Sequence, residues 1–335
     1  MEGYISAREK SGYYVMEAEA GYEPRRRTSY TAMQTGSRGE EASNITIDLT
    51  SNRAAIEKFP YDTWAKVMRG ILSEKENVLL DTVPFAGVYE LRVEIARYLY
   101  EYRGMDVEPE QIIIGAGTEY LYGRLLQLLG RNSIYAIEDP GYHRFSRIYH
   151  ANDLQWCYVE IDEDGIVIDS LKQSGANVVH VSPGHHFPTG IIMPAGRRQE
   201  LLAWTQEELG RYIIEDDYDS EFRYAGKPIP ALQSQDPFGK VIYIGTLSKV
   251  IAPAIRLSYM VLPQEWMERY HKTAGFYFST VSRIDQWVIS RFFLQGHFER
   301  HLNRMRKVYR MKHECILQEL KNAGLDVKIE GESAG

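Results

Sequence analysis

Short apolar runs alternate with helix-like segments along the chain beyond residue 44, and this pattern predicts the fold. The segment 195–209, for example, is helix-like and lies between two such runs. Near-continuous apolar strands separated by helices are typical of a parallel sheet that helices cover on both faces. We therefore predict an α/β fold with a parallel sheet covered by helices. Its predicted strands are residues 111–114, 134–137, 154–159, 178–181, 212–214 and 241–244.

The pattern changes at both ends of the chain. Residues 1–16 contain two strand-prone pieces around a polar turn, as in a β-hairpin, and residues 17–44 are polar enough to form a linker. Residues 263–323 have the pattern of long helices, and residues 325–331 begin a strand that has nothing after it to pair with. We predict four parts: a hairpin at 1–16, a linker at 17–44, a large domain at 45–295 and the start of an incomplete small domain at 296–335.

The composition excludes several classes of protein. Of the 335 residues, 44% are hydrophobic and 25% charged, which is typical of a globular protein. A formal net charge of −7 argues against nucleic acid as the main partner, because duplex binding needs clustered positive charge. Two cysteines cannot form a disulfide framework, and we find neither a bilayer-spanning apolar run nor a secretion signal. We therefore predict a cytoplasmic protein.

Glycine-rich and charged segments follow the predicted strands. In an open α/β sheet, ligands bind in the crevice beyond the carboxyl ends of the strands. The segments found there are GAGT (115–118), EDPGYHR (138–144), SPGHHFPTG (182–190), EDDYD (215–219) and GTLSK (245–249). The sequence thus predicts a binding site at this edge of the sheet.

Lys249 and the acidic segment 215–219 are the most informative of these features. Lysine loses its proton readily when it is removed from water, and neutral lysine condenses with carbonyl groups. An aspartate that faces a pyridine nitrogen keeps that nitrogen protonated, which makes the ring an electron sink. We expect one phosphate to be bound by the groups nearby, namely Thr246, Ser248, Arg256 and the helix that begins at Thr118.

Each candidate also has a purely structural interpretation. The glycine turn at 115–117 also suits a plain strand-to-helix connection, and Lys249 also suits an exposed loop. The other structural alternatives are an ion pair at the strand edge for Arg256, core packing for Tyr142 and a surface salt bridge for Arg144. The pairs His185–His186 and His297/His301 lack a third ligand at suitable spacing, so we predict no metal site.

Several segments resemble one family. TLSKVIAPAIRLSYMVLP (246–263) resembles the region around the Schiff-base lysine of fold-type-I pyridoxal phosphate enzymes, the aspartate aminotransferase superfamily. FPYDTW (59–64) and GAGTEYLY (115–122) follow that family's order. EDPGYHR, HHFPTG and EDDYDSEF resemble more specifically the aminotransferase-like domain of MocR/GabR-type bacterial regulators, which a GntR-type winged helix precedes. GYISAREKSGYYV (3–15) looks like the wing of that DNA-binding domain.

The resemblance implies the fold-type-I architecture, with a mixed, mostly parallel sheet covered by helices. It also implies pyridoxal 5'-phosphate as cofactor and a role for each matching residue. Lys249 would form the Schiff base, Asp216 would pair with the pyridine nitrogen and Tyr218 would bond the ring 3-hydroxyl. Asp217 is the alternative to Asp216. The remaining implied roles are ring stacking for Tyr142, a ligand carboxylate for Arg144 and the phosphate for Gly117, Thr118, Thr246, Ser248 and Arg256.

The chain also departs from the family. Phe187 replaces an asparagine that bonds the 3-hydroxyl in many aminotransferases, and Thr82 replaces a tyrosine that often reaches the neighbouring subunit's phosphate. The small domain, which carries the arginine for the substrate carboxylate, is mostly absent. The winged helix is reduced to its last hairpin. We therefore expect a chain that is truncated at both ends.

Two functions follow from the resemblance. The first is a pyridoxal phosphate protein that acts on amino-acid-type amines through Lys249, by transamination or by aldimine formation alone. The second is the effector-sensing module of a GntR/MocR-family regulator with little or no turnover. We expect a homodimer that contacts DNA only through the missing N-terminal domain and does not bind membranes.

Overall fold

The computed structural model describes residues 5–15, 55–74, 77–224 and 229–324, and the chain divides into two compact units, Met1–Asn52 and Arg53–Gly335. In the first unit, β1 (Ile5–Arg8) and β2 (Gly12–Val15) form an antiparallel hairpin. The structure thus has a hairpin where the sequence predicts one. The predicted linker at 17–44 and the predicted strand at 325–331 lie outside the described residues.

The second unit is built on one sheet with the strand order β3-β10-β9-β8-β7-β4-β5-β6. The strands are β3 (Ile112–Gly115), β4 (Ile134–Asp139), β5 (Gln155–Asp162), β6 (Gly165–Ile166), β7 (Val178–Val181), β8 (Tyr212–Asp217), β9 (Val241–Thr246) and β10 (Ser258–Val261). Neighbours from β5 through β4, β7 and β8 to β9 pair in parallel. Strand β10 runs antiparallel to β3 and β9, and β6 runs antiparallel to β5. The predicted mixed, mostly parallel sheet is confirmed.

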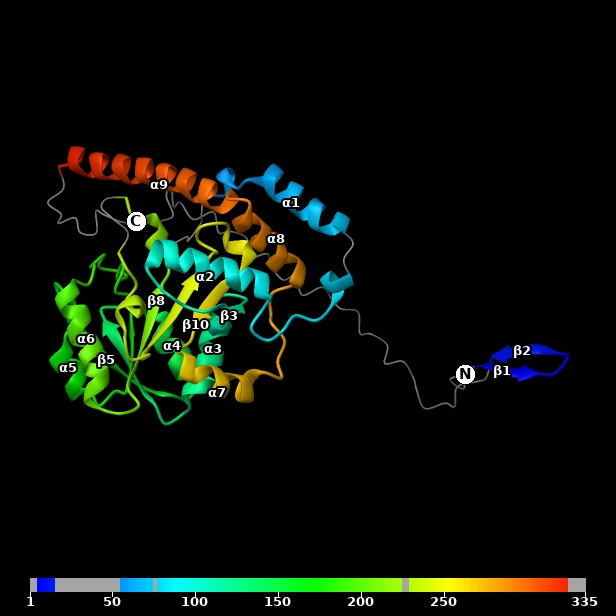
Figure 1. Ribbon diagram of the computed structural model, residues 1–335, viewed down its shortest axis with the longest axis horizontal. Coiled ribbons are helices and arrows are strands. Elements are labelled where there is room, and N and C mark those ends of the chain that lie inside the picture. The colour runs from blue at the N-terminus through cyan, green and yellow to red at the C-terminus, as the bar shows by residue number, and fades with distance from the viewer. Residues whose placement is uncertain (1–4, 16–54, 75–76, 225–228, 325–335) are drawn as a thin grey trace, which may run out of the picture. The chain divides into compact units, whose positions relative to one another are not determined.

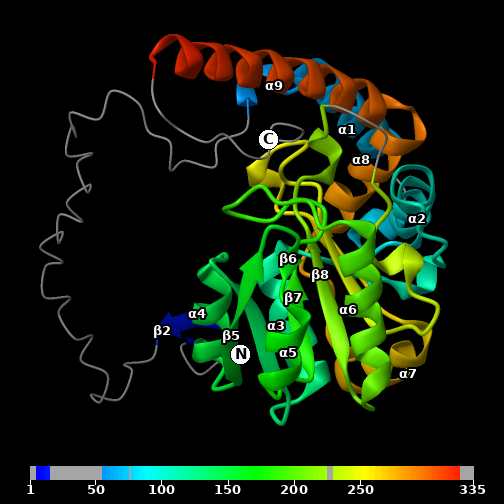
Figure 2. The same cartoon turned by 90° about the vertical axis from the view of Figure 1, so that its left-hand side faces the viewer.

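Helices cover both faces of this sheet (Figures 1 and 2). They are α1 (Tyr61–Glu74), α2 (Tyr89–Arg103), α3 (Thr118–Leu129), α4 (Arg144–Ala151), α5 (Ile168–Gln173), α6 (Ala195–Glu207), α7 (Gln264–Ala274), α8 (Arg283–Leu294) and α9 (His297–Asn322). Helices α3, α4 and α7 pack on one face, whereas α2, α8 and α9, together with α5 and α6, pack on the other. Within the described residues, we find no helix with the length and apolar character that a membrane span requires.

All six predicted strands form, with ends that differ by a few residues, and three helices lie within the predicted helical region 263–323. The sequence analysis did not identify β10. Its residues are all buried between β3 and β9, against which it runs antiparallel. The chain reaches this position directly from the loop after β9, without a crossover helix, so the alternation of strands and helices does not indicate it.

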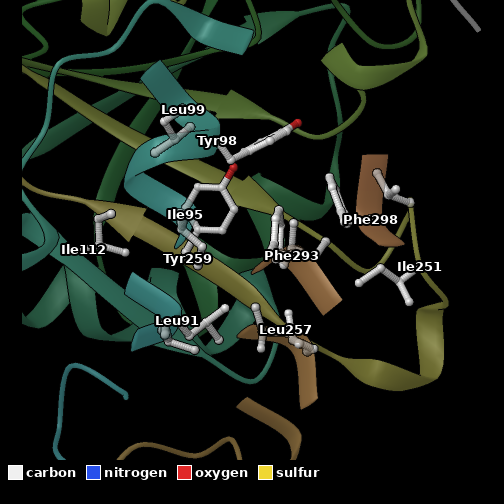
Figure 3. Packing of buried hydrophobic residues seen from close by; sticks show 14 of the residues in the cluster. Leu91, Ile95, Tyr98, Leu99, Ile112, Ile251, Leu257, Tyr259, Phe293 and Phe298 are labelled. Carbon is white, nitrogen blue, oxygen red and sulfur yellow. The ribbon is translucent and has the colours of Figure 1, made fainter. Parts of the chain in front are cut away.

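The largest apolar cluster lies between the sheet and helices α2, α8 and α9 (Figure 3). Tyr98 of α2 packs edge-on against Phe298 of α9 and donates a 2.8 Å hydrogen bond to Glu221 Oε1. Phe293 of α8 stacks on Phe298 with 4.1 Å between ring centres. The beginning of α9 is therefore part of the same core as the sheet.

A buried ion pair joins the end of α2 to the end of β8. Arg103 Nη2 lies 2.7 Å from Asp217 Oδ2, and each side chain is only 5% exposed. Tyr243 donates a 2.5 Å hydrogen bond to the same carboxylate oxygen. Burial disfavours the Arg103 charge, yet Asp217 and its neighbours hold the guanidinium pKa above its usual value. Both charges are thus compensated only by each other and by the polar groups around them.

We expect Arg103→Met to lower the free energy of unfolding by about 3–5 kcal/mol, because it leaves the Asp217 carboxylate buried without a cation. Urea denaturation measures this change. Lys272→Met is the control, since it breaks an exposed ion pair with Glu268 of 2.6 Å and should cost about 0.5 kcal/mol or less. Equal effects of the two substitutions would contradict the prediction.

Candidate functional site

The carboxyl ends of β3, β4, β7, β8 and β9 lie at one edge of the sheet, and β10 begins there. Each of the polar segments that the sequence analysis identified lies at the end of one of these strands or directly after it. The register places Ser258, the first residue of β10, opposite Gly115 on one side and Thr246 on the other. The segments after β3 and β9 are therefore neighbours, although more than a hundred residues separate them.

Lys249 lies in the loop that follows β9, and its amine faces residues that follow β8. The Nζ atom is 3.3 Å from Asp219 Oδ2 and 4.8 Å from the centre of the Tyr218 ring. The Lys249 side chain is 41% exposed, whereas that of Asp219 is 3% exposed. Behind Lys249, the buried His301 of α9 donates a 2.9 Å hydrogen bond from Nε2 to the Val250 carbonyl, which anchors the loop. Of the predicted residues, Lys249 and Tyr218 are thus brought together.

His185, in the loop after β7, completes this cluster. Its Nδ1 lies 2.8 Å from Asp219 Oδ2 and 3.3 Å from the Tyr218 hydroxyl, and its ring stacks on that of Tyr218. A carboxylate can only accept, so Nδ1 carries the proton in this hydrogen bond. Sequence reasoning gave neither His185 nor Asp219 a role, although both lie in polar loops at strand ends. No group of metal-ligating side chains occurs among the described residues.

Asp216 and Asp217 point to opposite faces of β8, because successive side chains of a strand alternate. Asp217 faces Arg103 and Tyr243 in the buried ion pair described above, and its Oδ1 accepts the Ser220 N–H at 3.2 Å. Asp216 faces Tyr122 of α3 instead. The Arg103 ion pair therefore occupies Asp217, and this favours Asp216 as the acid that meets a ligand.

Three buried side chains form a series of hydrogen bonds that leads to Asp216. His180 of β7 is hydrogen-bonded through Nε2 to the Tyr122 hydroxyl at 2.9 Å and through Nδ1 to the Tyr149 hydroxyl at 3.0 Å. Burial lowers the pKa of His180 to about 3, so this imidazole is neutral. Burial, followed by the charges of the neighbouring carboxylates, raises the pKa of Asp216 to about 7, while a hydrogen bond from Tyr122 acts against this rise. A positively charged N–H group placed beside Asp216 would ionise it.

The predicted phosphate-binding residues gather at the start of β10 and of α3. The Thr246 hydroxyl oxygen accepts hydrogen bonds from the Ser248 backbone N–H at 3.2 Å and from the Ser258 hydroxyl at 2.9 Å. Helix α3 begins at Thr118, and its N-cap residue Gly117 has no side chain to cap it; the carboxylate of Glu119 instead accepts its own backbone N–H. Backbone N–H groups at a helix start, together with hydroxyl groups, suit an anion.

Gly117 and Arg256 approach each other closely in this region. Gly117 has φ +91°, a backbone conformation that favours glycine, and a Cβ atom there would lie 2.3 Å from Arg256 Nη2, so the arginine would have to move. Arg256 Nη2 is 2.6 Å from Glu119 Oε2, and Arg144 Nη1 is 3.3 Å from Glu119 Oε1. Burial opposes ionisation of Glu119, yet its own backbone N–H and the two arginines lower its pKa.

Both arginines thus form ion pairs, which is the structural alternative that the sequence left open for each. Sequence reasoning did not single out Glu119, which lies one residue beyond the predicted phosphate-binding residue Thr118. The Glu119 carboxylate lies where the two arginines meet, and all three side chains are substantially exposed. An incoming anion can therefore displace it.

Tyr142 lies outside the buried core. Its ring packs edge-to-face against Phe187 at 5.6 Å and against Phe145 at 5.3 Å, and the Arg144 guanidinium lies 5.5 Å from its centre. Phe187 itself is 47% exposed. These contacts hold a half-buried aromatic ring beside the edge of the sheet, outside the clusters of buried residues.

The known proteins that this chain is similar to are aminotransferases and transcriptional regulators. Residues 44–333 match the family described as aminotransferase class I and II. The chain is 38% identical over 335 residues to the uncharacterized HTH-type transcriptional regulator YdeL of Bacillus subtilis (strain 168), which covers 100% of this chain and 72% of that protein. It is 29% identical over 263 residues to the probable rhizopine catabolism regulatory protein MocR of Rhizobium meliloti. This match covers 78% of this chain and 53% of that protein.

A solved structure has the same fold. An archaeal alanine:glyoxylate aminotransferase superposes with a TM-score of 0.74 and 26% sequence identity, over 84% of this chain and 74% of that chain. The predicted fold class and the resemblance stated for the sequence are thereby confirmed.

We expect Asp216→Asn to stabilise the ligand-free protein more at pH 8 than at pH 5. The unfolded carboxyl ionises near pH 4 and the folded one near pH 7. The folded state therefore binds the extra proton between these values, and stability falls as the pH rises through them. The substitution removes this loss, so its gain in unfolding free energy should be greater at pH 8 by on the order of 2–3 kcal/mol.

Urea denaturation at the two pH values measures this difference. Asp106→Asn is the control, because Asp106 is exposed and its replacement should have the same small effect at both values. If Asp216→Asn also had the same effect at pH 5 and pH 8, Asp216 would not be an acid with a raised pKa in the folded protein.

Proposed function

Because this chain belongs to the aminotransferase class I and II family, as an aminotransferase-like domain of the kind found in MocR-type regulators, we propose that it binds amino-acid-type amines through Lys249. Pyridoxal phosphate is the cofactor of this family. When bound, it supplies an aldehyde carbon that condenses with amines and a ring that takes up electron density. The residue roles below are part of the proposal.

The residues at the carboxyl edge fit the phosphate of this cofactor. Several groups can donate to a phosphate, namely the backbone N–H groups at the start of α3, the Thr246 and Ser248 hydroxyls and the Arg256 guanidinium. Gly117 leaves room beside Arg256 that any side chain would fill. We infer that the phosphate takes the place of the Glu119 carboxylate on Arg256.

The residues after β8 and β9 fit the ring and the aldehyde. The observation that carries the proposal is the Lys249 amine, 4.8 Å from the Tyr218 ring and 3.3 Å from a buried carboxylate. In this proposal Lys249 is the nucleophile, and the Asp216 carboxylate pairs with the protonated ring nitrogen. The Tyr218 hydroxyl bonds the ring 3-hydroxyl, and Tyr142 supplies an aromatic face for the ring.

The fate of the bound amine distinguishes two candidate functions. In transamination, Lys249 moves the α-proton of the amine, which is the work of a general base. In effector sensing, the amine stays bound and the protein changes shape. The names of the relatives YdeL and MocR describe regulators, which supports the second candidate beside the first. Arg144 is the proposed contact for a carboxylate of the ligand, once Glu119 is displaced.

We also propose that the protein is a cytoplasmic homodimer. Phe276 and Phe278, between α7 and α8, are 70% and 63% exposed. Large exposed aromatic side chains are typical of interfaces, and this supports the homodimer that the sequence predicts. The scarcity of cysteines supports a cytoplasmic location.

We expect the purified protein to bind added pyridoxal phosphate covalently and to gain the corresponding absorption band. Lys249→Ala should abolish the band, because it removes the amine. Lys240→Ala is the matched control, since Lys240 precedes the other end of the same strand, β9, and should keep the band. Absorption spectra after dialysis measure this, and a wild-type protein without the band would rule out the proposed function.

We expect amino acids, added one at a time, to change the spectrum of the loaded protein. Conversion to the pyridoxamine form with release of one equivalent of keto acid would identify transamination. A spectral change that persists without keto acid would identify sensing. Mass spectrometry of the cofactor and a keto-acid assay measure these outcomes, and the absence of any change with all amino acids would contradict both candidates.

A further inference from the structure

The hydrogen bonds that lead to Asp216 run through a buried imidazole. His180 of β7 lies between two tyrosine hydroxyls, with Nε2 at 2.9 Å from that of Tyr122 and Nδ1 at 3.0 Å from that of Tyr149. Each of these three side chains is at most 3% exposed. Tyr122 is in turn hydrogen-bonded to Asp216. The series therefore connects α4, β7 and α3 to the acid on β8.

The number of protons in this series limits the directions in which its hydrogen bonds can run. Burial lowers the pKa of His180 to about 3, so its ring is neutral and carries one proton, on Nδ1 or on Nε2. One tyrosine must therefore donate to the ring, while the other accepts from it. Each hydroxyl has a single proton, so only the tyrosine that accepts from His180 can donate to another group.

The partners of the two hydroxyls decide the direction. Among the described residues, the Tyr149 hydroxyl is hydrogen-bonded to His180 alone, whereas Tyr122 also has the Asp216 carboxylate. With the proton on Nδ1, Tyr122 would donate to Nε2, and the Tyr149 proton would have no acceptor. With the proton on Nε2, Tyr149 donates to Nδ1, His180 donates to the Tyr122 oxygen and Tyr122 donates to Asp216. Every proton then has an acceptor, which matters because an unsatisfied buried donor is costly.

A neutral donor leaves the charge of Asp216 available to a ligand. The neighbouring Asp217 is paired with Arg103 at 2.7 Å, so a cation already compensates its charge. The charges of Asp217 and Asp219 favour the protonated form of Asp216, whereas the hydrogen bond from Tyr122 favours the ionised form. A hydroxyl stabilises a carboxylate without neutralising it.

The other groups around this series are neutral or apolar. Tyr218 and Tyr149 are further titratable side chains close to Asp216, and burial, as the largest cause, raises the pKa of each, so both are uncharged at neutral pH. The Phe145 ring of α4 lies against the His180 ring, with 3.8 Å between the ring centres. These neighbours supply no charge that would fix the direction of the series, so the hydrogen bonds themselves determine it.

We propose that Tyr122 is a positioning residue for Asp216, because His180, protonated on Nε2, donates to the Tyr122 oxygen and thereby directs the hydroxyl proton of Tyr122 to the Asp216 carboxylate. This hydrogen bond favours the ionised carboxylate. The inference rests on the proposed function for its consequence, which is that ionised Asp216 pairs with the ring nitrogen of the cofactor. The direction of the hydrogen bonds can be measured in the ligand-free protein.

The first test uses the ligand-free wild-type protein with 15N-labelled histidine. NMR at pH 9, above the Asp216 pKa of about 7, shows which ring nitrogen of His180 carries the proton, and contacts with the rings of Tyr122 and Tyr149 assign the signals. The proton should be on Nε2 alone, whereas an exposed imidazole adopts a mixture of both tautomers. A proton on Nδ1, or a mixture, would overturn the proposal, and this measurement requires no variant to fold.

The second test removes the hydroxyl of Tyr122. Tyr122→Phe should raise the pKa of Asp216 by about one pH unit, because the carboxylate loses a donor that favours its charged form. NMR of 13C-labelled aspartate measures the titration, and Asp216→Asn identifies the signal. Tyr270→Phe is the matched control, since both tyrosines are 2% exposed and belong to the same apolar cluster, and it should leave the pKa unchanged. An unchanged or lower pKa in Tyr122→Phe would overturn the proposal.

The third test removes the acceptor at the end of the series. In Asp216→Leu, either direction leaves one hydroxyl proton without an acceptor, so His180 should adopt a mixture of tautomers with part of the proton on Nδ1. Asp219→Asn is the control, because Asp219 is a nearby acid outside the series, and His180 should stay protonated on Nε2 alone. The same single tautomer in Asp216→Leu would contradict the proposed direction.

The last test connects Tyr122 to the cofactor. Pyridoxamine 5'-phosphate has the ring and the phosphate of the cofactor but no aldehyde, so its binding is reversible and can be titrated. Tyr122→Phe should weaken this binding about fivefold at pH 7 but less than about twofold at pH 9, where Asp216 is ionised in both proteins. Equal weakening at the two pH values would indicate a merely structural role and overturn the proposal.

The failure of the proposed function would have a different result. If the wild-type protein binds no pyridoxamine 5'-phosphate, the proposed function fails. The tautomer of His180 and the titration of Asp216 in the ligand-free protein then still decide whether Tyr122 donates to Asp216.

Discussion

The compensation of buried carboxylates at the end of β8 is the constraint on which the rest of the site depends. Asp217 is paired with Arg103 on one face of the sheet. Asp219 shares one oxygen between His185 and Lys249. Asp216 precedes both of these acids in sequence and forms no ion pair among the described residues; burial, followed by the charges of the neighbouring carboxylates, raises its pKa to about 7. Three acids within four positions therefore have three different environments.

The site therefore suits a ligand that carries both a positive and a negative group. A protonated ring nitrogen would ionise Asp216 and supply the missing cation. An anionic group could bind the two arginines that are ion-paired with Glu119 in the ligand-free protein, next to Gly117, which has no side chain. In the proposed binding mode, the phosphate would replace the Glu119 carboxylate on Arg256, and Arg144 would become available to the ligand. Such an exchange would connect cofactor binding to ligand recognition.

Much of this could be predicted from the sequence. The apolar runs located the strands, and in a parallel sheet their ends must meet at one edge, so Lys249 and Tyr218 could be assigned to one site. The choice between Asp216 and Asp217 could not be made, because it depends on which face of β8 meets Arg103. Glu119, His185 and Asp219 were missed because their partners come from distant segments. The hidden strand β10 was missed because its antiparallel direction leaves no mark on the apolar pattern.

The sequence by itself determined the alternation of strands and helices, the edge at which the polar segments gather and the side chain that can react with a carbonyl group. These follow from local periodicity and from the chemistry of single residues, which need no knowledge of distant contacts. Only the tertiary structure decided which acids are paired, which is left protonated and how the lysine is held. Charge compensation is a property of distances between segments, and the chain fixes those distances only when it folds.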